Sequence, residues 1–208
     1  IENLRNTPFS LLTGALDEGF YRNKLTAYTK AALEQTKFAY RVELLPGYGH
    51  HIDYSLTTPW LAQYKRNPTP LHVSWEDFEM DGRYRRGFSN LVVLERPDTQ
   101  GRTYYDETIS NNTIDLSVNN VVYTTIEKDT IWGIDLKFQK HFTPATSGKI
   151  RIYISENQID LKRPVRILVN GQEKFNGRLR PSLKAMAESL SVFYDPERIF
   201  PVYVDITI

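Results

Sequence analysis

The stretch between residues 7 and 45 limits the possible folds more than any other part of the sequence. Residues 7–13 form a short apolar run ending at Gly14, which is typical of a buried strand. Residues 23–37 contain no Gly or Pro and space their apolar side chains as a helix does, and residues 39–45 are again rich in strand-forming side chains. A strand–helix–strand unit of this length normally belongs to a parallel sheet. Two strands alone are not a stable sheet, so we expect further strands to come from elsewhere.

The sequence changes in character after a polar, proline-containing linker at residues 64–70. Beyond it, short runs rich in β-branched and aromatic residues follow one another closely, which predicts strands rather than helices. The predicted strands are residues 71–78, 87–95, 113–116, 121–125, 130–136, 149–155 and 165–169. Turn residues are expected between them, at residues 97–101, at Asn111-Asn112 and at Asn119-Asn120.

Three further features complete the predicted architecture. Asn170-Gly171 separates residues 165–169 from 172–175 and favours a tight hairpin, because both residues tolerate the positive φ of a type I′ turn. Pro181 is expected to open a helix, and the alternation in residues 202–208 predicts an antiparallel strand with one buried face. The fold class is therefore α/β plus all-β: a strand–helix–strand–helix segment at residues 1–66, then an antiparallel β-sandwich-like domain with one helix at residues 71–208.

The composition excludes several classes of function. The chain of 208 residues contains no cysteine, so disulfides, thiolate metal sites and a cysteine nucleophile are ruled out. Lys and Arg number 26 against 25 Asp and Glu, and such a balance gives no overall field to attract nucleic acid. The longest apolar runs are far shorter than the roughly 20 residues of a membrane-spanning helix. We therefore expect neither a nucleic-acid partner nor a membrane span.

Two residues stand out as candidates for catalysis. Asp17 follows the first predicted strand directly, and His50 lies in the glycine-rich segment Pro46-Gly47-Tyr48-Gly49-His50 after the second. Open α/β sheets place their active sites beyond the carboxyl ends of the strands. A single crossover unit would bring the two side chains together, and a carboxylate bonded to imidazole Nδ1–H orients a histidine for acyl transfer.

Other readings of the same residues stay open. Asp17 alone is equally consistent with a turn-capping role, and a lone loop histidine is more often solvated than catalytic. His51 is the fallback for His50. His50, His51 and Asp53 could also be read as metal ligands, but adjacent histidines point apart in extended backbone and no further ligands cluster nearby. We expect no metal and no cofactor.

Three motifs resemble the last strand–helix–strand segment of α/β-hydrolases. They are TPFSLLTGALDEGF at residues 7–20, PGYGHHIDY at 46–54 and TPWLAQYKRNP at 58–68. The resemblance is to serine esterases and peptidases, both prolyl-oligopeptidase-like and polyester-depolymerase-like, some of which carry a β-rich C-terminal extension. It implies that residues 1–66 are the C-terminal segment of an α/β-hydrolase domain and residues 71–208 an accessory domain. It also implies that Asp17 is the triad acid and His50 the triad histidine, and it favours an extracytoplasmic location.

The chain departs from that family in one informative respect. No Gly-x-Ser-x-Gly motif occurs, although the α/β-hydrolase order Ser, Asp, His places the nucleophile upstream of the acid. The sequence opens at Ile1 rather than Met. We therefore expect the serine to lie in an upstream half of the same hydrolase, which would be the principal partner; a second copy of the chain is the other partner considered. The alternative function is a non-catalytic β-sandwich protein that binds glycans or another protein.

Overall fold

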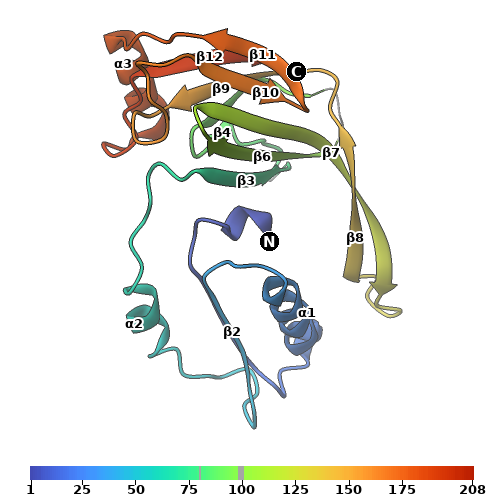
Figure 1. Ribbon diagram of the computed structural model, residues 1–208. Helices are drawn as coiled ribbons and strands as arrows, with labels where there is room; N and C mark the ends of the chain where they lie inside the picture. Colours follow the sequence, from blue (N-terminus) through green and yellow to red (C-terminus); the bar gives the residue numbers. More distant parts are fainter. Residues whose placement is uncertain (80, 98–100) are drawn as a thin grey trace. The chain divides into compact units, whose positions relative to one another are not determined.

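A computed structural model describes residues 1–79, 81–97 and 101–208 of the chain. The protein is mixed α/β and consists mostly of strands. It divides into two compact units (Figure 1). The first comprises Ile1–Asn67 together with Thr124–Gln139, and the second comprises Pro68–Tyr123 together with Lys140–Ile208.

The first unit contains the strand–helix–strand arrangement expected from the sequence. Strand β1 (Phe9–Gly14) leads through the 3-10 turn η2 (Gly19–Tyr21) into helix α1 (Arg22–Glu34), which returns the chain to strand β2 (Tyr40–Leu45). The two strands are parallel, in register from Phe9 opposite Tyr40 to Gly14 opposite Leu45. The predicted parallel pair is therefore confirmed. A one-turn 3-10 helix η1 (Glu2–Leu4) precedes β1, and a short helix α2 (Thr57–Leu61) follows β2.

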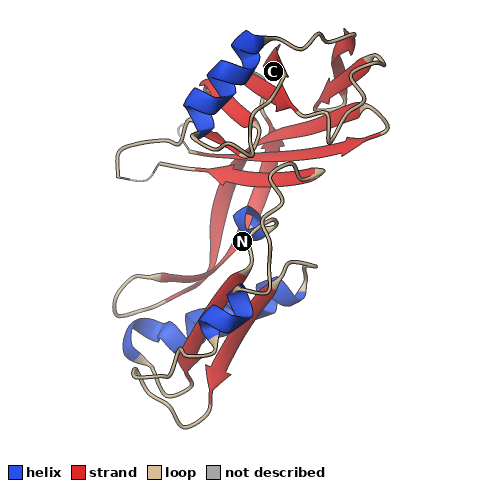
Figure 2. Ribbon diagram, turned by 90° about the vertical axis from the view of Figure 1, so that its left-hand side faces the viewer, coloured by secondary structure: helices blue, strands red, loops and turns tan. Residues whose placement is uncertain are grey.

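Helix α1 packs against the two-stranded sheet through a small core (Figure 2). Leu12 of β1, Val42 of β2 and Leu33 of α1 are buried. The hydroxyl groups of Thr13 and Thr26 lie 2.8 Å apart and satisfy each other in this core. Ala31 and Ala32 on the opposite side are exposed. The core is small for an independent α/β domain, as expected of only two strands.

A long hairpin contributes the remaining residues of the first unit. Strands β7 (Thr113–Lys128) and β8 (Asp135–Pro144) pair, and their distal halves, within Thr124–Gln139, lie beside α1 (Figure 1). The Glu127 carboxylate accepts hydrogen bonds from Lys24 and Tyr28 of α1. The sequence predicted a domain boundary at residues 66–71, which placed the whole hairpin in the β-rich domain. In the structure, the distal half of the hairpin contacts α1 and belongs to the first unit.

The second unit is built from two sheets. One has the strand order β11-β10-β7-β6-β3, with β8 paired to β7, and the other has the order β12-β9-β5-β4. The bounds of its further elements are β3 (His72–Asp77), β4 (Gly87–Phe88), β5 (Leu91–Glu95), β6 (Arg102–Ser110), β9 (Lys149–Ile154), β10 (Val165–Val169), β11 (Gln172–Gly177), α3 (Leu183–Phe193) and β12 (Val202–Thr207).

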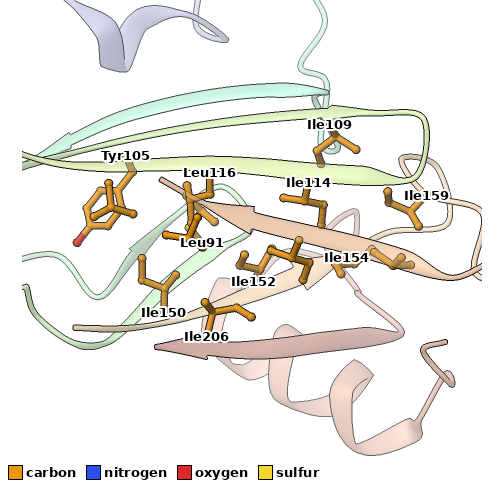
Figure 3. Packing of buried hydrophobic residues seen from close by; sticks show 14 of the residues in the cluster. Leu91, Tyr105, Ile109, Ile114, Leu116, Ile150, Ile152, Ile154, Ile159 and Ile206 are labelled. Carbon is orange, nitrogen blue, oxygen red and sulfur yellow. The ribbon is translucent and has the colours of Figure 1, made fainter. Parts of the chain in front are cut away.

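The two sheets enclose one hydrophobic core (Figure 3). Ile114 and Leu116 of β7 meet Ile150 and Ile152 of β9, and each of these side chains is almost completely buried. Trp75 stacks on Tyr105 with ring centroids 4.9 Å apart. Burial of one such side chain contributes roughly 1.5–3 kcal/mol, so this core is large enough to stabilise the β-rich unit.

Several local predictions for this unit hold. Asn170 and Gly171 have φ values of 49° and 76°, and they join the antiparallel pair β10–β11 as the type I′ turn requires. Asn111 and Asn112 form the turn between β6 and β7. Helix α3 begins two residues after Pro181, and the Ser182 side chain caps it by accepting a hydrogen bond from the Ala185 N–H.

Other local predictions are wrong. Asn119 and Asn120 do not form a turn but pair with Tyr104 and Thr103 in the continuous strand β7, because a long cross-strand partner outweighs the weak strand propensity of asparagine. Strand β6 was not anticipated, and the unit is not purely antiparallel, since β10 runs parallel to β7. Part of the turn predicted at residues 97–101 lies outside the described residues.

No helix among the described residues is long and apolar enough to cross a membrane.

Candidate active site

The candidate site forms where β1 and β2 end side by side. The loop after β1 carries Asp17 and the loop after β2 carries His50. Backbone hydrogen bonds join the two loops, from Ala15 N–H to the Leu45 carbonyl and from Leu16 N–H to the Tyr48 carbonyl, both at 2.9 Å. The parallel register therefore continues beyond the strands and fixes one loop against the other.

Gly14 makes this close approach possible. A Cβ atom at position 14 would lie 2.0 Å from the carbonyl oxygen of Gly49 and 2.3 Å from that of Tyr48. Backbone atoms cannot give way as a flexible side chain can, so only glycine fits at the end of β1. The sequence uses this residue to bring the histidine-bearing loop against the loop that carries Asp17.

Asp17 and His50 are in direct contact, as the sequence predicted. The Asp17 Oδ2 and His50 Nδ1 atoms are 3.0 Å apart. An ionised carboxylate can only accept hydrogen bonds, so Nδ1 donates. The Asp17 side chain is 8% exposed and that of His50 is 63% exposed. The acid is therefore enclosed while the far edge of the imidazole stays open to solvent. The His51 ring lies next to that of His50, with centroids 5.6 Å apart.

A second hydrogen-bond donor, Arg22 at the start of α1, holds the other oxygen of the Asp17 carboxylate. Its guanidinium donates to Asp17 Oδ1 at 3.1 Å. The hydrogen bond from His50 lowers the pKa of Asp17 below its usual value; desolvation opposes this, and Arg22 adds to the lowering. The acid is thus held ionised, which is the state that can orient an imidazole and stabilise its protonated form.

The His50 Nε2 atom is the open position of this pair. No serine or threonine hydroxyl hydrogen-bonds to His50 in the part of the chain that the structure describes. A general base must lie within hydrogen-bond reach of the proton it removes. The described residues therefore supply an acid–histidine pair and no nucleophile for it.

The same residues do not gather as a metal site. Among residues 1–79, 81–97 and 101–208, no three His, Asp or Glu side chains are grouped as ligands of a metal ion. Asp53 instead accepts hydrogen bonds from the backbone N–H and the hydroxyl of Ser55, which lower its pKa. Its role is that of a turn cap.

Sequence reasoning missed the part of the site contributed by the hairpin. The Tyr21 hydroxyl donates a hydrogen bond to Asp129, which lies at the tip of the β7–β8 hairpin and is 108 residues away in the sequence. The Phe20 and Trp132 rings lie beside each other with centroids 6.0 Å apart. Because the two residues are so far apart in the sequence, their contact produces no local sequence pattern from which it could be predicted. The one signal present in the sequence is that aromatic residues follow each acid closely, Phe20 and Tyr21 after Asp17 and Trp132 after Asp129.

Comparison with protein-family models, with curated proteins and with solved structures found no match to this chain.

Proposed function

We propose that this chain supplies the acid and the base of a serine hydrolase of the α/β-hydrolase class, which cleaves ester or amide bonds. In this proposal Asp17 is the triad acid and His50 the triad histidine. The observation that carries it is the 3.0 Å contact between Asp17 Oδ2 and His50 Nδ1 at the carboxyl ends of two adjacent parallel strands. A catalytic acid and base of this class occupy those two loops in the order acid, then histidine.

The serine and the oxyanion hole come, in this proposal, from a segment outside the printed sequence. The absence of a Gly-x-Ser-x-Gly motif supports this. The small sheet supports it as well, because β1 and β2 would be the last strands of a larger parallel sheet. Leu16 and Tyr48 at its end are 65% and 51% exposed, and such apolar surface is available to further elements.

The reaction would proceed by proton transfer through His50. The serine oxygen bonds to the substrate carbonyl carbon while His50 Nε2 takes the proton of the serine hydroxyl. This step gives a tetrahedral intermediate and an imidazolium. Asp17 stabilises that imidazolium through Nδ1–H. The imidazolium then gives its proton to the departing alcohol or amine as the carbon–heteroatom bond breaks. Water, activated by the same imidazole, releases the acid and restores the serine.

A fluorophosphonate probe tests the proposal. It phosphonylates serines that are activated by a neighbouring histidine, so mass spectrometry should find one modified serine in the protein extended upstream of Ile1. The His50→Ala variant of that protein should lose the modification, while His51→Ala should retain it. An extended protein that does not react, or one that reacts equally well without His50, would exclude the proposed function.

A further inference from the structure

The β7–β8 hairpin tip and the Asp17 loop form one apolar surface, here called the aromatic rim: Phe20, Ile131 and Trp132. Phe20 is 63% exposed, Trp132 is 65% exposed and Ile131 is 80% exposed. The two rings lie 6.0 Å apart and are tilted by 56°. Large apolar side chains that gather at the surface from distant segments mark a binding site more often than a scattered exposed residue does.

The rim is held in place rather than left to fluctuate. The Asp129 carboxylate is buried and accepts hydrogen bonds from the Tyr21 hydroxyl and from the N–H groups of Ile131 and Trp132. Although desolvation raises the pKa of Asp129, these hydrogen bonds outweigh it and lower that pKa. One ionised carboxylate thus ties the hairpin tip to the Asp17 loop.

The backbone of the rim is strained. Phe20 and Tyr21 have φ values of 50° and 56°, in the left-handed region that bulky residues avoid. Such strain destabilises the fold and persists only where surrounding contacts enforce it. The conformation directs the Tyr21 hydroxyl to Asp129 and leaves the Phe20 ring exposed beside Trp132. Exposing an aromatic ring at this cost indicates a use for the ring.

The rim continues directly into the candidate active site. Phe20 is three residues from Asp17, and the Arg22 guanidinium, which binds Asp17, lies 5.3 Å from the Phe20 ring centroid. Two charged groups that contact the rim residues already have partners: the Arg22 guanidinium binds Asp17, and the Asp129 carboxylate accepts hydrogen bonds from Tyr21, Ile131 and Trp132. The exposed side chains of the rim itself are ring faces and a branched alkyl group, which suit an uncharged ring.

We propose that the aromatic rim binds an uncharged aromatic group of the substrate and holds it beside Asp17 and His50. This rests on the proposed hydrolase function and names the substrate class of that site: esters or amides that carry an aryl group. Phe20 and Trp132 contact the substrate ring, and Ile131 covers its edge. Asp129 and Tyr21 are positioning residues that hold the hairpin tip against the Asp17 loop.

Nuclear magnetic resonance tests the binding on the full chain, with ethyl 3-phenylpropanoate as the probe and ethyl acetate as the control ester. The chain has three tryptophans, and the Trp132→Ala variant assigns the Trp132 indole signal. We expect the aryl ester to shift this signal saturably and to leave the other two unchanged. Phe20→Ala should weaken the affinity about five- to tenfold, whereas Leu183→Ala, at an 84% exposed position of the other unit, should not change it. Equal shifts of all three indoles, or none, would overturn the proposal.

Kinetics of the protein extended upstream separate this inference from the proposed function. Trp132→Ala should lower the ratio of kcat/KM for the phenylpropanoate ester to that for ethyl acetate about tenfold. An unchanged ratio would overturn the role of the rim while leaving the hydrolase intact. Binding at Trp132 with no hydrolysis of either ester would overturn the hydrolase and leave the binding site standing. A Trp132 indole that no longer responds to the ester in the extended protein would show that the upstream segment, and not substrate, occupies the rim.

Discussion

The His50 imidazole donates a hydrogen bond from Nδ1 to Asp17 across 3.0 Å, although the two residues are 33 positions apart in the sequence. This one contact fixes which nitrogen carries the proton. With Nδ1–H bound to an ionised carboxylate, Nε2 of the neutral ring is an acceptor and is available as a base. The enclosed acid and exposed imidazole therefore have the arrangement that proton transfer to a reacting group requires.

Replacement of His50 by alanine should abolish turnover in the protein extended upstream of Ile1. Loss of the base removes the proton acceptor from the transition state, so kcat should fall by about three orders of magnitude or more. Steady-state hydrolysis of a p-nitrophenyl ester measures the effect. The control is His51→Ala, because His51 neighbours His50 but makes no hydrogen bond or ion pair with Asp17 among the described residues. Loss of turnover in the His51 variant, with the His50 variant still active, would move the assignment to His51.

Replacement of Asp17 by asparagine should leave the fold intact and lower kcat by about four orders of magnitude. The amide can donate a hydrogen bond to Nδ1, which places the ring proton on Nε2 and so removes the base. Arg22 would lose its charged partner in the same variant. An Arg22→Gln control separates the two effects: it keeps the Asp17–His50 contact, so its loss of kcat should be much smaller. Near-full activity of Asp17→Asn would contradict the triad assignment.

The contact between Asp17 and His50 could be predicted because its causes are local. Each residue follows a recognisable strand, and a crossover unit brings adjacent strand ends together. The role of Gly14 could not be read in the same way, since the atoms it approaches belong to residues 48 and 49. The tie between Tyr21 and Asp129 was equally out of reach, because it depends on where a hairpin of the β-rich part folds.

Substitution of Gly14 by alanine should separate the two loops of the candidate site. The new Cβ would lie 2.0 Å from the Gly49 carbonyl oxygen, so the 46–50 loop must move. We expect the first unit to lose about 2 kcal/mol of stability and the proposed hydrolase activity to fall with it. Hydrogen exchange at the amides of β1 and β2 measures the stability.

The matched control for this substitution is Gly49→Ala. A Cβ at position 49 meets no atom within 4 Å, so this variant should retain both stability and activity. If Gly14→Ala exchanged no faster than Gly49→Ala, the loops would not depend on their close approach.

In the β-rich unit, sequence patterns gave the strands with clear turn residues at their ends and failed where tertiary pairing decided the structure. Asn170-Gly171 turns the chain because both residues adopt positive φ within the turn itself. Asn119-Asn120 has the same turn-forming character, yet it lies within β7 because β6 pairs along the whole segment. Glu107 of β6 shows the same limit, because a charged residue in the core is not expected from alternation alone.

Glu107 is completely buried between the sheets and titrates abnormally. Its Oε1 accepts a hydrogen bond from the Asn90 side chain, and its Oε2 has no hydrogen-bond partner among the described residues. Burial raises the pKa of Glu107 from 4.5 to about 7, and the nearby charge of Asp106 adds to this, while the Asn90 hydrogen bond opposes it. The folded protein therefore binds this proton more tightly than the unfolded chain does.

Protonated Glu107 should make the β-rich unit more stable in mild acid than at neutral pH. Because the pKa is raised in the folded state, the stabilisation is fully present below pH 4.5 and is lost as the pH rises towards about 7. A shift of this size corresponds to about 3 kcal/mol. In the Glu107→Gln variant the side-chain amide oxygen still accepts the hydrogen bond from Asn90, but the side chain carries no charge. The variant should therefore lack this pH dependence, and at pH 8 it should be more stable than the wild type. Urea unfolding at pH 5 and pH 8 measures both effects, with Glu156→Gln at an exposed position as the control. The same pH dependence in the wild type and in the Glu107 variant would show that another group is responsible.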